Sequence, residues 1–134
     1  MMFTLFPLLF GLAIAFFVLW YGSKTAADKY PVLRITVPDN AESSPEWQRW
    51  AQDNGYKAQG GGLWQKGTGM LTSATEIRFE GNEMQVRECV NYIFGINRFA
   101  INAPSWMGRP VRAVKIKALN ALFAQWQIAP VSFG

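Results

Sequence analysis

The stretch EIRFEGNEMQVR, residues 76–87, carries the strongest local signal in the chain. Two runs that alternate apolar and polar residues flank the dipeptide Gly81–Asn82, which is typical of the two-residue loop of a tight β-hairpin. The alternation predicts an inner face of four apolar side chains: Ile77, Phe79, Met84 and Val86. It predicts an outer face whose residues can form cross-strand charge pairs: Glu76, Arg78, Glu80, Gln85 and Arg87. The hairpin therefore predicts a half-buried antiparallel sheet.

Upstream of the hairpin, the sequence predicts a strand and a helix. Leu33, Ile35 and Val37 alternate with polar residues, as in a half-buried strand. The run Ser43-Ser44-Pro45-Glu46, with a serine cap, an early proline and an early glutamate, then marks the start of a helix of about three turns. Residues 63–66 and 70–79 are expected to be extended.

Downstream, residues 90–94 are predicted to prolong the second hairpin strand, and residues 98–102 to add another. A second helix is predicted from Arg109 until Pro130 closes it. Its apolar positions recur with helical spacing and are expected to pack on the sheet: Val111, Val114, Ala118, Leu119, Leu122, Phe123 and Trp126. The fold class is therefore α+β, a small two-layer domain with two helices on an antiparallel β meander of three or four strands.

A long apolar segment precedes this domain. Phe3–Tyr21 holds 19 consecutive residues without a charge, and as a helix it is about 28 Å long, close to the hydrocarbon thickness of a bilayer. Trp20 and Tyr21 fall at its end, where such rings favour the headgroup layer. We therefore predict an N-terminal single transmembrane helix as the anchor. A cleaved signal peptide is the alternative, but no basic residue precedes the apolar run.

The predicted organisation is a transmembrane anchor over residues 1–23, a polar linker over 24–30, an α+β domain over 31–130 and a tail over 131–134. Lys24, Lys29 and Arg34 follow the anchor with one acid among them. The positive-inside rule therefore places the domain in the cytoplasm, with a periplasmic domain as the alternative.

The composition excludes several classes of function. The 134-residue chain has a net charge of +4, no histidine and one cysteine, which rules out a Ser-His triad, most zinc sites and an internal disulfide. The acids Glu76, Glu80, Glu83 and Glu88 alternate with other side chains, as on a solvated strand face, and Cys89 reads as a small buried residue. We therefore expect no catalytic residues, no cofactor and no metal site, and a protein that is not an enzyme.

Basic residues dominate the end of the chain, where no acid follows Glu88. Arg109, Arg112 and Lys115 lie about one turn apart along one helical flank, next to a loop that carries Trp106 and Met107. These five residues form the predicted interaction surface, which suits anionic lipids or a protein partner better than nucleic acid. The other interpretations are an ordinary solvated helix face and a Trp106 ring packed over the core edge.

These observations predict a single-pass, membrane-anchored, non-enzymatic accessory subunit of a larger membrane complex. Gly11 and Ala15 form a small-xxx-small pair that would allow close packing with another transmembrane helix, with Trp20 and Tyr21 at the end of the span. The alternative is a membrane-tethered binding module for anionic lipid headgroups or a small anionic ligand, which would use the basic helix.

Overall fold

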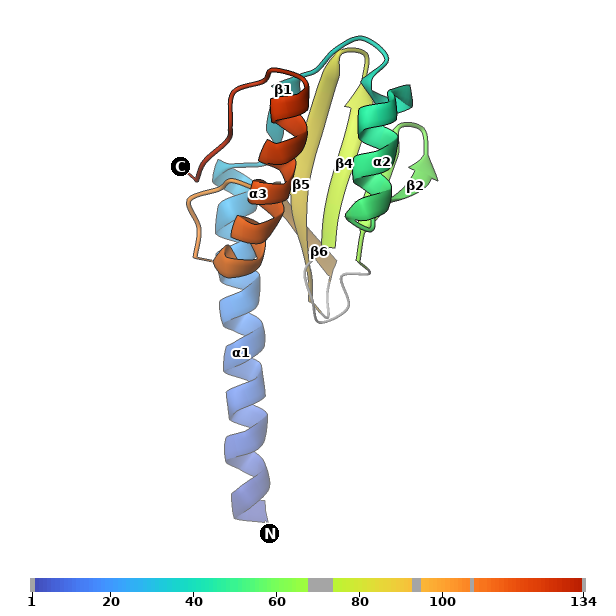
Figure 1. Ribbon diagram of the computed structural model, residues 1–134. Coiled ribbons are helices and arrows are strands. Elements are labelled where there is room, and N and C mark those ends of the chain that lie inside the picture. Colours follow the sequence, from blue (N-terminus) through green and yellow to red (C-terminus); the bar gives the residue numbers. More distant parts are fainter. Residues whose placement is uncertain (1, 68–73, 93–94, 107, 134) are drawn as a thin grey trace.

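A computed structural model describes residues 2–67, 74–92, 95–106 and 108–133. At residues 2–10, 16, 19, 23, 91, 92 and 95 it describes the course of the backbone and not the side chain. The chain forms a long N-terminal helix, α1 (Met2–Lys29), and an α+β domain in which helices cover one face of an antiparallel sheet (Figure 1).

Six strands form the sheet within the described residues. They are β1 (Leu33–Thr36), β2 (Lys57–Gly60), β3 (Leu63–Lys66), β4 (Ala74–Glu80), β5 (Glu83–Tyr92) and β6 (Gly95–Ala100). The order is β1-β5-β4-β3-β2, and every pairing is antiparallel. β6 pairs with residues 87–92 of β5, and β1 pairs with residues 83–86 of the same strand. β6 and β1 therefore follow one another along a single edge of β5.

The predicted hairpin is confirmed. Glu80 lies opposite Glu83 across the Gly81–Asn82 loop, and Ile77 lies opposite Val86. The four residues of the predicted inner face are all buried: Ile77, Phe79, Met84 and Val86. Their apolar side chains form the floor on which the helices pack.

Two helices cover this floor, with the short 3-10 helix η1 (Ala41–Ser43) before the first of them, α2 (Pro45–Asp53). The Ser44 hydroxyl accepts a hydrogen bond from the Trp47 amide (3.2 Å), as expected of a helix cap. The Trp47 ring is fully buried and meets the Phe79 ring edge-on, with 4.7 Å between ring centroids. Trp50 Nε1 donates to the Ala118 carbonyl (2.8 Å), which joins α2 to α3 (Arg109–Gln125).

The predicted packing face of α3 is partly wrong. Val111 and Val114 are 50% and 71% exposed, whereas two charged residues of the same helix are buried. The buried stripe consists of Arg112, Lys115, Ile116, Leu119, Leu122 and Phe123. These positions also recur with helical spacing, so a stripe rotated by about one residue is equally regular. The charged groups of Arg112 and Lys115 can be buried because each makes hydrogen bonds inside the domain.

The opposite face of the sheet carries charged side chains, as predicted from the hairpin. Arg34 pairs with Glu83 (2.6 Å) and Arg98 pairs with Glu76 (3.1 Å). Gln85 lies on this face but is only 7% exposed. Exposed ion pairs of this kind contribute little to stability, so the fold depends on the helix-covered face.

Strand boundaries differ from the prediction in three places. β2 was missed, because KAQG has neither alternation nor branched residues and is paired only through its neighbour β3. The last strand begins at Gly95 rather than at Arg98 and ends at Ala100. After α2 the described residues consequently contain five strands, β2 to β6, instead of the predicted meander of three or four. The predicted extended residues 70–73 and the end of the predicted 90–94 extension lie outside the described residues.

The predicted linker over residues 24–30 is helical instead, up to Lys29. Ala26 and Ala27 pack against a second apolar cluster that contains Val90, Phe99 and Ala103. This packing stabilises the helix beyond the apolar segment. The helix ends at Lys29, because Pro31 disfavours the helical conformation of Tyr30 before it. The domain is thus attached to α1 without a flexible segment.

Residues 131–133, predicted as a tail, pack on the domain. The Asn120 side chain bonds the backbone of Val131 twice, at 2.8 and 2.9 Å, and Phe133 packs against the main core. These bonds satisfy backbone groups that a free end would leave to water.

Within the part of α1 and the other helices that the structure describes, none is both long enough and apolar enough to cross a membrane. The side chains of residues 2–10, Phe16 and Leu19, which belong to the predicted span, lie outside the described set.

Candidate functional site

One hollow that joins sequence-predicted residues lies between α1 and the loop from β6 to α3. Its volume is about 340 Å³. Two segments line it: Tyr21, Gly22, Thr25, Ala26 and Lys29 from the end of α1 with Tyr30 directly after it, and Pro104, Ser105 and Trp106 from the loop. Figure 1 shows this loop, in orange, beside the domain end of α1. We call this hollow the junction site.

The α1 wall of the junction site is held firmly on the sheet. Asn97 of β6 donates its side-chain amide to the Trp20 carbonyl (3.4 Å), and the Ala100 amide donates to the Tyr30 carbonyl (2.7 Å). Between these two bonds, Ala26 is 4% exposed and packs on Val90 and Phe99. The last turns of α1 are therefore part of the domain.

The loop wall is held by Arg112. Its guanidinium donates to the carbonyls of Ile101 (2.9 Å) and Ala103 (2.8 Å), and also to that of Ser105. Two rings lie against the same cation, Phe99 at 5.2 Å and Phe133 at 5.1 Å. A buried guanidinium is tolerated when its donors are satisfied, and here they fix the path of the loop.

Arg112 is therefore not part of an exposed surface, contrary to the prediction. It is fully buried, and burial lowers its pKa while Glu88 opposes that change. Its partners are backbone carbonyls of a neighbouring loop, which a pattern of side chains along the helix does not indicate.

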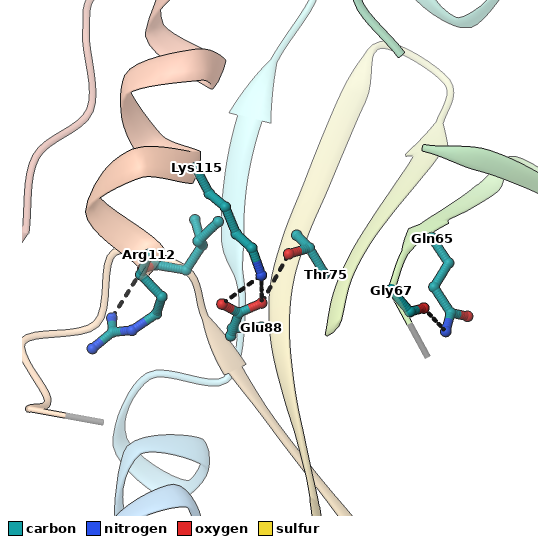
Figure 2. Close-up of polar contacts among 7 residues, drawn as sticks. Gln65, Gly67, Thr75, Glu88, Arg112 and Lys115 are labelled. Atoms are coloured by element: carbon teal, nitrogen blue, oxygen red, sulfur yellow. Dashed lines mark hydrogen bonds and ion pairs between the residues drawn. The ribbon is translucent and has the colours of Figure 1, made fainter. Parts of the chain in front are cut away.

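Lys115 is likewise buried and pairs with Glu88. The Lys115 ammonium lies 2.9 and 3.0 Å from the two carboxylate oxygens, and Thr75 donates to the same carboxylate at 2.8 Å (Figure 2). Glu88 is 1% exposed and Lys115 is 8% exposed. The predictions that Glu88 faces water and that Lys115 belongs to an interaction surface are therefore wrong.

The pKa values of two acidic side chains in this region, Glu88 and Tyr56, are raised. Burial raises the pKa of Glu88, and the opposing effects of Lys115 and Thr75 do not cancel it. Burial also raises the pKa of the Tyr56 phenol, and Thr75 opposes this change. The network connects β4, β5 and α3 inside the core, where it fixes the position of the helix.

Of the other three residues of the predicted interaction surface, Trp106 and Arg109 are exposed. Trp106 is 61% exposed, so its ring is not packed over the core edge. Arg109 is exposed at the start of α3, with its guanidinium 4.4 Å from the Phe133 ring. Met107 lies outside the described residues.

The residues predicted to pack α1 against membrane partners are accessible to different degrees. Gly11 and Ala15 are exposed, Tyr21 is 61% exposed and Trp20 is half-buried. The Lys24 ammonium lies over the Trp20 ring, 5.1 Å from its centroid. Tyr21 and Trp106, which the sequence assigned to separate surfaces, line one hollow.

Sequence reasoning missed three polar residues of the junction site, because it placed them in a linker: Thr25, Lys29 and Tyr30. A signal was present. The α1 positions that line the site are 21, 22, 25, 26 and 29, which lie on one side of a helix. This stripe continues the helix past the apolar segment and could have been recognised.

Among the described residues, no group of three or more Cys, Asp or Glu side chains is placed to hold a metal ion. No family model matches the chain, and no curated protein or solved structure is significantly similar to it.

Proposed function

We propose that the protein is a single-pass, membrane-anchored, non-enzymatic accessory subunit of a larger membrane complex. The observation that carries the proposal is the exposure of apolar side chains on α1. The helix itself projects away from the domain (Figure 1). Leu12 is 49% exposed and Phe17 is 61% exposed. Contiguous apolar surface of this kind normally contacts lipid or another protein.

The sequence of α1 supports insertion in a bilayer. The uncharged run Phe3–Tyr21 is about as long as the hydrocarbon layer is thick, and aromatic residues end it. The first basic residues after it are Lys24 and Lys29, so the positive-inside rule favours a cytoplasmic domain.

The exposed small residues of α1 support a helix partner. A Cβ added at Gly11 would meet nothing within 4 Å, so a larger side chain there leaves this chain undisturbed. Ala15 is exposed one turn later. Small residues at this spacing allow two transmembrane helices to approach closely.

The domain also offers apolar surface to a partner. The ring of Trp106 and the side chains of Val111 and Val114 are exposed. The ionisable pair of Glu88 and Lys115 is enclosed between the sheet and α3, where a substrate has no access. These features favour contact with a protein over catalysis.

Replacement of the small residues tests the proposal. We expect Gly11→Leu with Ala15→Leu to remove the copurifying membrane partners of the tagged full chain, as measured by mass spectrometry after mild detergent extraction. Ala13→Leu is the matched control, because Ala13 is also exposed but lies on a different side of the helix. Partners that survive the double replacement would refute helix packing through this face.

A second variant tests the domain surface. Val114→Asp places a charge at a position that is 71% exposed, so it should weaken partner copurification without unfolding the domain. Ala113→Asp is the control, because Ala113 is exposed on a different side of α3. Equal copurification of the two variants would contradict a partner contact at Val114.

The alternative, a module for anionic headgroups, needs a different set of residues from those first predicted. Arg112 and Lys115 are committed to internal partners, which leaves Lys24, Lys29 and Arg109 as exposed cations near the end of α1 and the start of α3. The basic flank of α3 therefore does not support that alternative, whereas the junction site does.

A further inference from the structure

We infer that the junction site binds the phosphate-bearing headgroup of one anionic phospholipid. The inference rests on the proposed membrane anchor, because α1 must carry the site to the surface of a bilayer. It concerns the hollow between the end of α1 and the loop that carries Trp106.

The position of the site along α1 matches the headgroup layer. With Tyr21 at the end of the uncharged run, the rise of the helix places Thr25 about 6 Å and Lys29 about 12 Å beyond it. The polar layer on each side of a bilayer is roughly 5–8 Å thick. Helical side chains lean toward the N-terminus, so Lys29 extends back toward the bilayer.

The chemistry of the lining residues favours a negative headgroup. Lys29 is the charged member of the set, and none of the described lining residues is acidic. Tyr21 and Tyr30 add hydroxyl groups of the kind that bind phosphate and glycerol oxygens. A choline headgroup would instead bring its positive charge close to Lys29, which opposes binding despite the aromatic rings nearby.

The walls of the site provide an apolar side as well. Pro104 and the Trp106 ring lie opposite the polar face of α1, and Trp106 is 61% exposed. An indole at the boundary between headgroups and acyl chains has both an apolar ring and a polar N–H to offer. The glycerol backbone and the first acyl carbons of a lipid would lie against this ring.

The loop wall is held in place by a buried guanidinium, that of Arg112. Arg112 is fully buried and donates to the carbonyls of three of the five residues before Trp106, which are Ile101, Ala103 and Ser105. A guanidinium in the interior destabilises the fold unless it is satisfied in full. These bonds hold the backbone from which the Trp106 side chain extends into the wall of the site.

Native mass spectrometry of the full chain in a neutral detergent, mixed with equal amounts of phosphatidylglycerol and phosphatidylcholine, tests the inference. We expect one phosphatidylglycerol per chain to be retained in preference to phosphatidylcholine. Lys29→Gln should weaken this retention about fivefold, the effect of one cation next to an anionic lipid. Lys117→Gln, an exposed lysine of α3 that does not line the site, should leave retention unchanged.

The remaining arms separate the sources of the phosphate and the two proposals. Competition by inorganic phosphate or glycerol 1-phosphate at the concentration of the lipid would overturn the lipid assignment, as would equal retention of the two lipids. Alkaline carbonate extraction of native membranes tests the anchor separately. A chain that is released by carbonate overturns both proposals. A chain that resists carbonate but retains no phosphatidylglycerol overturns the junction site alone.

Discussion

Loss of the Lys115 ammonium should destabilise the domain strongly at neutral pH. In Lys115→Met the apolar stem is retained, but Glu88 loses two hydrogen bonds of 2.9 and 3.0 Å and keeps the one from Thr75 at 2.8 Å. Removal of one partner from a buried ion pair lowers the free energy of unfolding by about 3–5 kcal/mol. Because Thr75 still supports the carboxylate, we expect about 3 kcal/mol, against a total of about 5–15 kcal/mol for an ordinary domain.

The double variant Glu88→Gln with Lys115→Met should recover most of this loss. Both charges are then absent, and the amide oxygen at position 88 still accepts from Thr75. Replacement of a complete buried pair by neutral groups is close to neutral in other proteins, so we expect a free energy of unfolding within about 1 kcal/mol of the wild type.

The penalty of Lys115→Met should also depend on pH. Burial raises the pKa of Glu88, and Lys115 is the main group that opposes this, so the variant holds its proton to higher pH. Between the ordinary carboxyl pKa of about 4.3 and this raised value, the folded state binds more protons than the unfolded state. Stability therefore falls as pH rises through this window, by up to about 1.4 kcal/mol per pH unit. The penalty should be smaller at pH 5 than at pH 7.

Urea unfolding of the full chain in a neutral detergent, followed by tryptophan fluorescence, measures these differences. A loss below about 1 kcal/mol for Lys115→Met at pH 7 would refute the strength assigned to the pair. A double variant as unstable as the sum of its single variants would show that Glu88 and Lys115 are not coupled.

Three further changes probe other parts of the structure. Gly62→Ala should lower the free energy of unfolding by about 1–3 kcal/mol more than Gly61→Ala. Both glycines have positive φ, but only a Cβ at position 62 would lie 2.6 Å from the Phe79 carbonyl oxygen. Equal losses of stability in urea unfolding would contradict this. Burial raises the pKa of the Cys89 thiol to about 12, so at pH 8 an aromatic disulfide reagent should label the chain only after unfolding, and rapid labelling of the native chain would disprove that protection. Arg112→Met should accelerate amide hydrogen exchange in the loop whose carbonyls it binds, and unchanged exchange there would show that the loop does not need this clamp.

The parts of the fold that were predicted correctly are those with local signals. Gly81–Asn82 fixes the hairpin because a two-residue loop sets the register of the strands on both sides. Ser44 fixes the start of α2 because its hydroxyl replaces a missing backbone acceptor. Neither depends on residues that are distant in the sequence.

The errors occur where distant residues decide. Residues 24–29 are polar enough to resemble a linker, and it is packing on Val90 and Phe99 that keeps them helical. Arg112 and Lys115 resemble a solvated flank, and their partners lie 7 to 27 residues away in the chain. The α1 side of the junction site could have been recognised from its helical spacing, but its pairing with the loop that carries Trp106 could not, because the finished sheet brings these two walls together.

The packing of Ala26 on residues from the end of the chain affects the order of events during synthesis. Ala26 leaves the ribosome well before the residues on which it packs, since Val90, Phe99 and Ala103 are among the last third of the chain. At about 5–20 residues per second, synthesis of the roughly 60 residues between Ala26 and Val90 takes about 3–12 s. For that interval α1 has no place on the sheet, and its apolar side chains need another partner. Ala26 and Ala27 can therefore take their places in the second apolar cluster only after Val90, Phe99 and Ala103 have been synthesised.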